Sequence, residues 1–310
     1  MKRTWIHHAI IVNEGRRFVG SVVIEGEKIQ EVIEGDGAPA AVCDEQIDAQ
    51  GCFLLPGVID DHVHFRDPGL THKADMATET AAAAAGGVTS FMDMPNCTPQ
   101  TTTLEALENK FKDAATKCIV NYSFYFGATN NNADQLKALD KTHVCGVKLF
   151  MGASTGNMLV DRMEALKKIF SEAGMLIATH CEDQQIIREN TERFKQQYGE
   201  DLDISFHPLI RSEEACYHSS ALAVQLAKET GARLHILHIS TARELGLLED
   251  RPLHEKKITA EACVSHLMFC DEDYAQFGAR IKCNPSIKTK TDRDALRKAL
   301  TTNLIDVIAT

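Results

Sequence analysis

Residues 213–239 read EEACYHSSALAVQLAKETGARLHILHI, a helix-like segment, a glycine and then a largely apolar run. Gly231 stands where a glycine is expected just past the end of a helix. The run that follows, Arg233–Ile239, does not alternate between apolar and polar residues, as is typical of a strand buried on both faces of a sheet. A helix followed directly by such a strand indicates an α/β fold with a parallel sheet.

The same alternation of strand and helix extends over most of the chain. Helices are predicted at Lys73–Ala85, Arg162–Ala173 and Glu213–Thr230, each followed by glycine. Eight strands favour a (β/α)8 barrel, or TIM barrel, and an open doubly wound sheet is the alternative. The predicted strands are Val58–His64, Val88–Met94, Ile119–Phe126, Val144–Phe150, Met175–His180, Arg233–Ile239, Lys257–Val264 and Leu304–Ala309.

The N-terminal segment has a different pattern. Its short strand-like runs TWIHHAIIV, FVGSVVIEG and EKIQEVIEG are separated by the turn residues Asn13-Glu14-Gly15 and Gly26-Glu27. We therefore expect two domains, a small β-rich part at residues 1–55 and the barrel at residues 56–310.

Composition and charge indicate an ordinary globular protein. Hydrophobic residues make up 44% of the chain and charged residues 25%, which is close to average usage. The formal net charge of −11 repels phosphate backbones and anionic membrane surfaces. We expect neither nucleic acid nor a membrane as a partner.

The cysteines and the N-terminus bear on location. Ten cysteines are scattered along the chain without a CxxC pair, which indicates free cytosolic thiols rather than disulfides. The short apolar run at the N-terminus is broken by two histidines, so it does not fit a signal peptide. No stretch approaches the ~18 to 20 consecutive apolar residues of a membrane helix. These features suggest a cytoplasmic location.

Four histidines and a lysine stand at the predicted carboxyl ends of barrel strands, where the active sites of such barrels lie. His62 and His64 are two residues apart on an extended segment, which puts both side chains on one face. Lys148, His180 and His238 lie near the ends of the fourth, fifth and sixth strands. Converging imidazoles suit zinc or a similar first-row divalent metal, and an open coordination position would make the site catalytic.

Histidines and lysines on strands can also have roles that involve no metal. A lone histidine on a strand is more often a core or surface residue than a ligand, and we assign His7, His8 and His235 to that group. A salt-bridged barrel lysine is the alternative for Lys148. The occurrence of histidines at the ends of three strands favours the metal site.

The chain resembles the dihydroorotases of the amidohydrolase superfamily, whose cyclic-amide hydrolases include hydantoinases and allantoinases. The resemblance covers nearly the whole chain. Its segments are GVIDDHVHFRDPG (57–69), AAAAAGGVTSFMDMPN (81–96), GVKLFMG (146–152), ATHCED (178–183), LHILHIST (234–241) and KCNPSIKTKTD (282–292).

The resemblance implies an α/β barrel with a small β-sandwich built partly from the N-terminal strands. It implies one or two Zn²⁺ ions per chain and a homodimer or homotetramer. Lys148 would be carboxylated and would bridge two metals, which agrees with physical chemistry because a free ammonium repels a cation whereas a carboxylated lysine attracts it. The implied metal ligands are His62, His64, Lys148, His180 and His238.

By the same resemblance, Arg66, Asn96 and Asn284 would bind the α-carboxylate of dihydroorotate. A guanidinium fork at Arg66 suits a carboxylate, whereas allantoinase-like sequences typically carry Asn in a corresponding HFNEPG segment and hydantoinases lack the FRDPG run. The alternatives are an ion pair of Arg66 with Asp67 or Asp75, and a turn role for Asn96.

The implied reaction is the reversible cyclisation of N-carbamoyl-L-aspartate to L-dihydroorotate plus water, in pyrimidine biosynthesis. A hydantoinase or allantoinase and a noncatalytic scaffold relative are the alternatives. The proton shuttle of the family is an aspartate at the end of the eighth strand, and it would directly follow Thr310, where the chain stops. We therefore expect that the sequence is a fragment of a longer chain.

Overall fold

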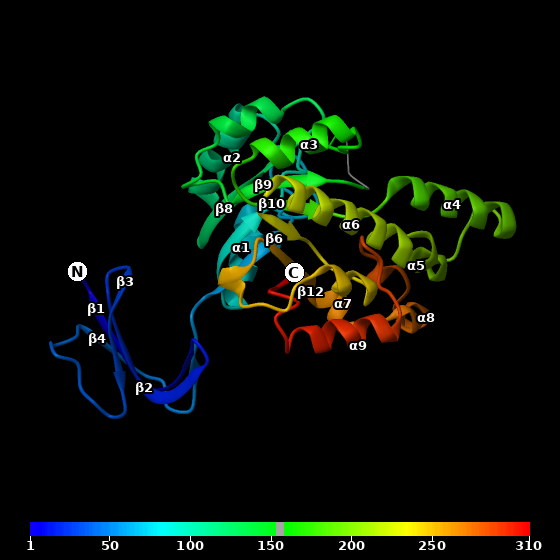
Figure 1. Cartoon of the computed structure of the whole chain (residues 1–310). Helices are drawn as coiled ribbons and strands as arrows, with labels where there is room; N and C mark the ends of the chain where they lie inside the picture. Colours follow the sequence, from blue (N-terminus) through cyan, green and yellow to red (C-terminus); the bar gives the residue numbers. More distant parts are fainter. Residues whose placement is uncertain (153–157) are drawn as a thin grey trace. The chain divides into compact units, whose positions relative to one another are not determined.

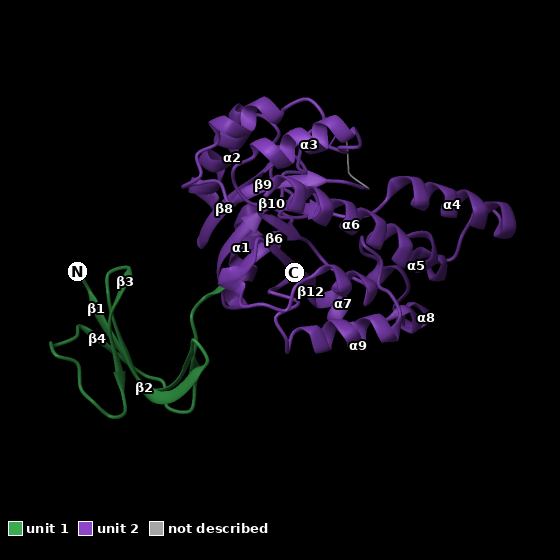
Figure 2. Cartoon of the chain, viewed as in Figure 1, with its two compact units in different colours: residues 1–58 green, residues 59–310 purple. Residues whose placement is uncertain are grey.

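The computed structural model describes residues 1–152 and 158–310, and Figure 1 follows them along the chain. They form two compact units, Met1–Val58 and Ile59–Thr310, which Figure 2 colours separately.

Unit 1 is a five-stranded sheet in the order β3-β2-β1-β4, with β5 also paired to β1. The first three strands are joined by antiparallel hairpins, and Gly15 and Gly26 take positive φ at the two turns. The short β4 and β5 run parallel to β1. The strands are β1 (Arg3–Asn13), β2 (Arg16–Glu25), β3 (Lys28–Glu34), β4 (Glu45–Asp48) and β5 (Phe53–Leu54).

The described residues of unit 2 form eight strands that lie in the sheet in the order in which they occur in the chain. This sequential order is that of a (β/α)8 barrel and confirms the predicted fold, because a doubly wound sheet reverses its strand order. Thr310 after the last strand donates to Asp60 in the first, from Oγ1 to Oδ2 at 2.6 Å. The strands are β6 (Val58–Val63), β7 (Val88–Asp93), β8 (Asn121–Gly127), β9 (Gly146–Phe150), β10 (Ile177–His180), β11 (Leu234–Ile236), β12 (Ile258–Cys263) and β13 (Val307–Ala309).

The helices connect these strands and surround them in Figure 1. Apolar side chains of the helices and of the outer strand faces form one core, which includes Phe124, Ile177, Leu226 and Ile236. The α-helices are α1 (Met76–Ala85), α2 (Leu104–Lys117), α3 (Met163–Glu172), α4 (Gln184–Tyr198), α5 (His207–Ile210), α6 (Glu213–Thr230), α7 (Val264–Met268), α8 (Tyr274–Phe277) and α9 (Lys290–Ala299). Short 3₁₀ helices are η1 (Ala133–Ala138), η2 (Ile204–Phe206), η3 (Arg243–Leu247), η4 (Leu253–Glu255), η5 (Asp271–Asp273) and η6 (Gly278–Ile281).

For six of the eight predicted strands, both the first and the last residue lie within two residues of the observed bounds. The other two observed strands, β11 and β13, are shorter than predicted. β11 stops at Ile236 because the chain turns through a positive φ at His238. β13 begins only at Val307, since residues 301–304 form a turn and a bend before it. The helix predicted from Lys73 begins three residues later, because the Asp75 side chain accepts from Thr78 N and caps α1.

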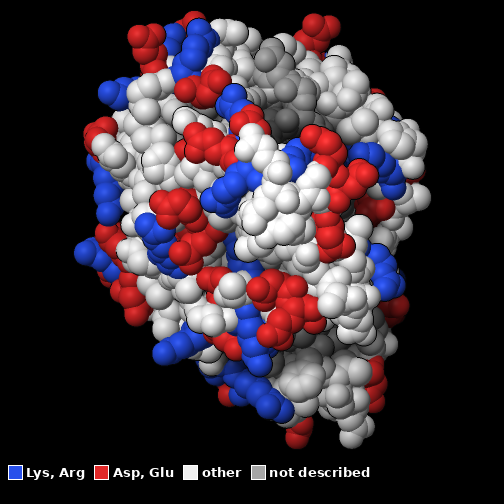
Figure 3. All heavy atoms as spheres, turned by 90° about the vertical axis from the view of Figure 1, so that its right-hand side faces the viewer, with Lys and Arg blue, Asp and Glu red and all other residues white. Residues whose placement is uncertain are grey.

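Charge is mixed over the surface that Figure 3 shows. Acidic and basic side chains alternate in small groups on this face. Within residues 1–152 and 158–310, no helix is both long and apolar enough to cross a membrane.

Candidate functional site

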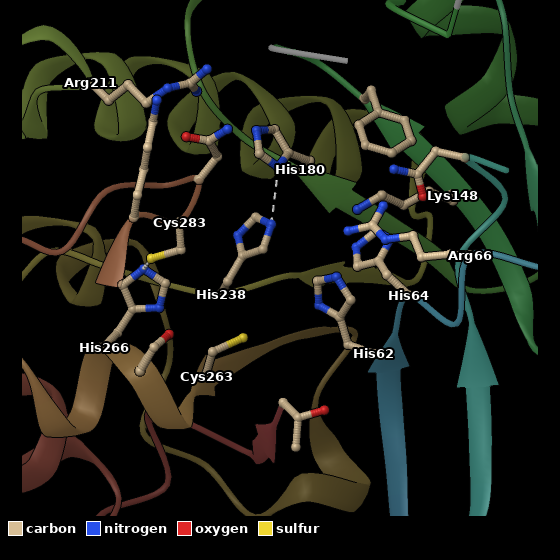
Figure 4. Close-up of a pocket in the computed structure, with 16 residues that line it drawn as sticks. His62, His64, Arg66, Lys148, His180, Arg211, His238, Cys263, His266 and Cys283 are labelled. Carbon is tan, nitrogen blue, oxygen red and sulfur yellow. Dashed lines mark hydrogen bonds between the residues drawn. The ribbon is translucent and has the colours of Figure 1, made fainter. Parts of the chain in front are cut away.

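A cavity of about 580 Å³ opens at the carboxyl ends of the barrel strands. Figure 4 shows side chains from separate strands and connecting segments pointing into it. All eight site residues predicted from the sequence line this cavity. They are His62, His64, Arg66, Asn96, Lys148, His180, His238 and Asn284.

The four histidines lie side by side in the cavity wall. Ring centroids are 5.3 Å apart for His62 and His64, 5.3 Å for His62 and His238, and 4.7 Å for His180 and His238. His180 Nδ1 and His238 Nε2 approach to 3.0 Å, the contact that is dashed in Figure 4. His64 and His238 stand just beyond β6 and β11, so the barrel itself brings the rings together.

Two buried glutamates fix the orientation of these rings. Glu261 Oε1 in β12 lies 2.5 Å from His62 Nδ1 and 3.0 Å from the backbone nitrogen of His238. Glu182 Oε2 lies 2.9 Å from His180 Nε2 and also accepts from Arg211. Because Glu261 takes Nδ1 of His62, Nε2 of that ring is left for a further partner, whereas Nδ1 of His180 already faces His238.

The pKa values favour ionised carboxylates and neutral imidazoles. Although burial raises the pKa of Glu261, the neighbouring His62 and His235 bring it below the usual glutamate range. Burial lowers the pKa of His64, His180 and His238, and neighbouring cationic groups lower it further. Neutral imidazole is the form that binds metals. A histidine that binds a metal usually donates its other ring N–H to a carboxylate, as His62 and His180 can do here.

A buried ring nitrogen and a cluster of donor atoms in the cavity are also suited to bind a cation. Among the residues that the structure describes, none is a hydrogen-bond partner of the buried His238 Nδ1. Ligand atoms of His62, Glu261 and Cys263 lie within 4.8 Å of one another, so this side of the cavity offers nitrogen, oxygen and sulfur donors. Such a donor set suits zinc and similar divalent ions.

Lys148 lies in the middle of β9 with 1% of its surface exposed. Burial lowers the pKa of its amine to about 7, and Nζ stands 4.6 Å from the centre of the Phe150 ring. A considerable share of this amine is therefore neutral and nucleophilic at neutral pH.

Arg66 and Asn96 lie beside the histidines. Arg66 takes a φ of +64°, a left-handed conformation that is uncommon for a residue other than glycine. The two alternative ion-pair partners are engaged elsewhere, since Asp67 pairs with Lys117 at 2.9 Å and Asp75 caps α1. The Asn96 side chain lies next to His64, where it partly offsets the lowering of the His64 pKa by burial, and among the described residues its buried Oδ1 has no partner at hydrogen-bonding geometry.

Several residues that line the cavity were not predicted as site residues from the sequence. Arg211, Lys282 and His266 come from segments outside the strands, where no periodicity marks their direction. Glu261 carried a readable signal, because a carboxylate within the apolar run ITAEAC is unusual for a buried strand. Glu182 had a similar signal, since it follows His180 by two residues on extended chain.

The fold and the cavity together define a class of protein, the parallel barrels whose strand ends carry a polar site rich in imidazole and carboxylate. The model of the Amidohydrolase family matches residues 53–310, and the chain belongs to that family.

Two curated relatives differ in the activity that their names state. The allantoinase of Deinococcus radiodurans is 31% identical over 310 residues, which cover 96% of this chain and 66% of that protein. The dihydroorotase of Methanosarcina mazei is 32% identical over 299 residues, which cover 93% of this chain and 64% of that protein. The chain thus spans slightly less than two thirds of each of these relatives.

Among solved structures, the L-hydantoinase of Arthrobacter aurescens superposes with a TM-score of 0.93 at 24% identity. The match covers 100% of this chain and 69% of that one. This likeness agrees with the barrel and with the N-terminal β domain.

Proposed function

We propose that this chain carries the catalytic centre of a metal-dependent cyclic-amide hydrolase whose substrate pair is dihydroorotate and N-carbamoyl-L-aspartate. The observation that carries the proposal is the position of Arg66, which lines the same cavity as the four histidines and Lys148. A guanidinium binds a carboxylate through two parallel hydrogen bonds, and dihydroorotate carries a carboxylate beside its cyclic amide. Asn96 and Asn284 add amide groups to the same wall.

The proposed metal ligands are the four histidines, with Lys148 as a carboxylated bridge between two ions. The buried neutral imidazoles and the two ring nitrogens that face each other at 3.0 Å fit such a group. When bound, a metal pair supplies hydroxide at neutral pH and polarises the scissile carbonyl. Zinc is the ion that we propose, on the donor set.

The side chains themselves then have separate tasks. Glu182 and Glu261 hold the His180 and His62 rings in one orientation each. Arg66 and the two asparagines would hold the substrate carboxylate, so that the ring amide is turned toward the histidines. The cavity of about 580 Å³ lies within the usual range for small-molecule sites.

The test is a comparison of three cyclic amides with one preparation of the full-length gene product, whose metal content is measured on the same sample. Hydrolysis of dihydroorotate in preference to allantoin and hydantoin is the expected result. Metal without turnover of dihydroorotate would contradict the proposed substrate, and absence of both would leave the scaffold alternative.

Allantoin is the second candidate substrate. The Deinococcus radiodurans relative is named an allantoinase and covers a larger share of this chain than the Methanosarcina mazei dihydroorotase does. Allantoin carries no carboxylate, so it offers the Arg66 guanidinium no anionic partner. The same assay separates the two, because turnover of allantoin alone would remove the role proposed for Arg66.

Replacing Arg66 by lysine is expected to raise the KM for dihydroorotate roughly 10- to 100-fold, because a charge-assisted forked contact is replaced by a single point charge. Lysine has the same unbranched Cβ, so the substitution adds no new backbone strain at this positive φ. Steady-state kinetics and metal analysis check the prediction. Loss of bound metal in the variant would place Arg66 in the metal centre instead.

Replacing Glu261 by glutamine is expected to lower zinc affinity about 10- to 100-fold, because the ring of His62 loses the carboxylate that orients it. Competition with a chromophoric chelator measures the affinity. The matched control is Glu249→Gln, which changes an exposed carboxylate paired with Arg251. Equal affinities for both variants would show that Glu261 does not support the metal centre.

A further inference from the structure

A β-bulge in unit 1 brings polar side chains together. Between the pairs Ile6–Val22 and Ala9–Gly20, the two residues His7 and His8 of β1 stand opposite the single residue Ser21 of β2. His8 takes a φ of +57°, a left-handed conformation that is uncommon for histidine. Bulges of this kind redirect side chains and are treated as built features of a sheet.

The bulge brings both imidazoles to one carboxylate. On the other side of β1, His7 is the register partner of Asp48 at the end of the parallel strand β4. Figure 1 shows β1 and β4 next to each other in unit 1. His8 Nδ1 lies 2.9 Å from Asp48 Oδ1 and 3.0 Å from His7 Nδ1, and His7 Nδ1 lies 3.8 Å from Asp48 Oδ1.

Protons alone do not satisfy this triangle. A ring nitrogen offers either one N–H or one lone pair, in a single direction. If His8 Nδ1 donates to Asp48, it cannot also accept from His7. If it accepts from His7, its lone pair faces the carboxylate. A cation at the centre of the triangle would take all three lone pairs at once.

The dimensions of the triangle suit a transition metal. Zinc binds histidine nitrogen and carboxylate oxygen at about 2.0 to 2.2 Å, so two ligands of a tetrahedral site lie about 3.3 Å apart. The three observed separations, 2.9, 3.0 and 3.8 Å, lie on both sides of that value. Two imidazoles and one carboxylate are also the donors that such ions prefer.

We propose that His7, His8 and Asp48 form a second metal site on the N-terminal sheet, which binds a first-row divalent ion such as Zn²⁺. This proposal reverses the interpretation of His7 and His8 as ordinary core or surface residues, and it does not depend on the proposed activity. The site is reachable, because the side chains of His8 and Asp48 are 49% and 55% exposed. Solvent would complete the coordination.

A metal there would connect two strands at the edge of the sheet. β4 has four residues, all of them exposed, and it is the last strand on its side of the sheet. An ion held by β1 and β4 together would stabilise this edge. The predicted consequence is a structural site whose loss leaves hydrolysis unchanged.

The fluorescence of a nearby tryptophan can report metal binding at this site. Trp5 is the one tryptophan of the sequence, and its ring centroid lies 4.4 Å from that of His7. Titration of the full-length gene product with Co²⁺, a paramagnetic quencher, is expected to reduce tryptophan emission in a saturable manner. Added Zn²⁺, which is diamagnetic, should compete and restore the emission.

The test variant is His8→Asn, since asparagine tolerates the left-handed conformation and removes the imidazole. The control is His143→Asn, which alters an exposed histidine that pairs with Asp140 at 2.8 Å in unit 2. We expect His8→Asn to lose the quenching and one bound metal ion per chain while keeping its hydrolytic rate. The control should behave as the unmodified protein does.

Two results would overturn the proposal. One is a Co²⁺ titration in which emission does not change, and the other is equal quenching in the His8→Asn variant and the unmodified protein. Thermal unfolding shows whether His8→Asn remains folded. If it does not, Asp48→Asn, which removes the exposed carboxylate, must show the same loss of quenching for the proposal to stand.

Discussion

Replacing Lys148 by alanine is expected to remove most of the bound metal and to slow hydrolysis by at least about 10³-fold, since each tenfold in rate corresponds to about 1.4 kcal/mol and metal catalysis supplies several. Lys148 is buried in the wall of the cavity that the four histidines line. As a carboxylated lysine it would supply the negative charge that holds two cations together, and alanine supplies none. Metal analysis and the dihydroorotate assay measure both effects.

Two further measurements separate a carboxylated lysine from an ordinary amine. Recovery of activity by the stripped, unmodified protein on addition of metal should require bicarbonate in the buffer. Acetate should partly restore metal binding and activity to Lys148→Ala, because it places a carboxylate where the side chain was. Unchanged metal content and full activity in Lys148→Ala would exclude the bridge, and recovery of activity without bicarbonate would exclude carboxylation.

The barrel could be predicted because its strands are short apolar runs that alternate with helices ended by glycine. The same regularity located the histidines, since the end of a barrel strand is where a polar side chain faces the site. His62, Lys148 and His180 were found in this way and line the cavity. Their roles as ligands remain a prediction.

Other features depend on contacts that the order of residues does not show. Arg211 reaches Glu182 from the segment after α5, so its position follows from how two connections pack. The bulge at His7 and His8 arises from a mismatch with β2, and a strand read by itself contains no sign of it. A buried pair between α2 and β7 is a third example, and it bears on the site.

This pair joins Lys110 of α2 to Asp93 at the end of β7. Nζ and Oδ2 are 2.5 Å apart, and the two side chains are 1% and 2% exposed. The other carboxylate oxygen of Asp93 accepts from the backbone nitrogen of Phe65 at 2.8 Å. Phe65 stands between His64 and Arg66, so the ion pair anchors the segment that carries two of the proposed functional residues.

Replacing Asp93 by alanine is therefore expected to destabilise the protein by about 3 to 5 kcal/mol, because it leaves the Lys110 ammonium buried without its carboxylate. That corresponds to a fall in Tm of roughly 10 °C at 2 to 4 °C per kcal/mol. Activity should fall as well at temperatures where the variant is folded, since the Phe65 nitrogen loses its acceptor. Calorimetry and the dihydroorotate assay check the two effects.

The control for this variant lies on the same helix. Glu108 and Lys112 form a pair that is 67% exposed on both sides, so Glu108→Ala should cost no more than about 0.5 kcal/mol. The double variant Asp93→Leu with Lys110→Met removes both buried charges and should recover most of the stability. It should not recover full activity, because leucine cannot accept from Phe65. A loss below about 1 kcal/mol in Asp93→Ala would show that the ammonium finds other acceptors, such as the carbonyl of Met94, which already lies 3.1 Å from Nζ.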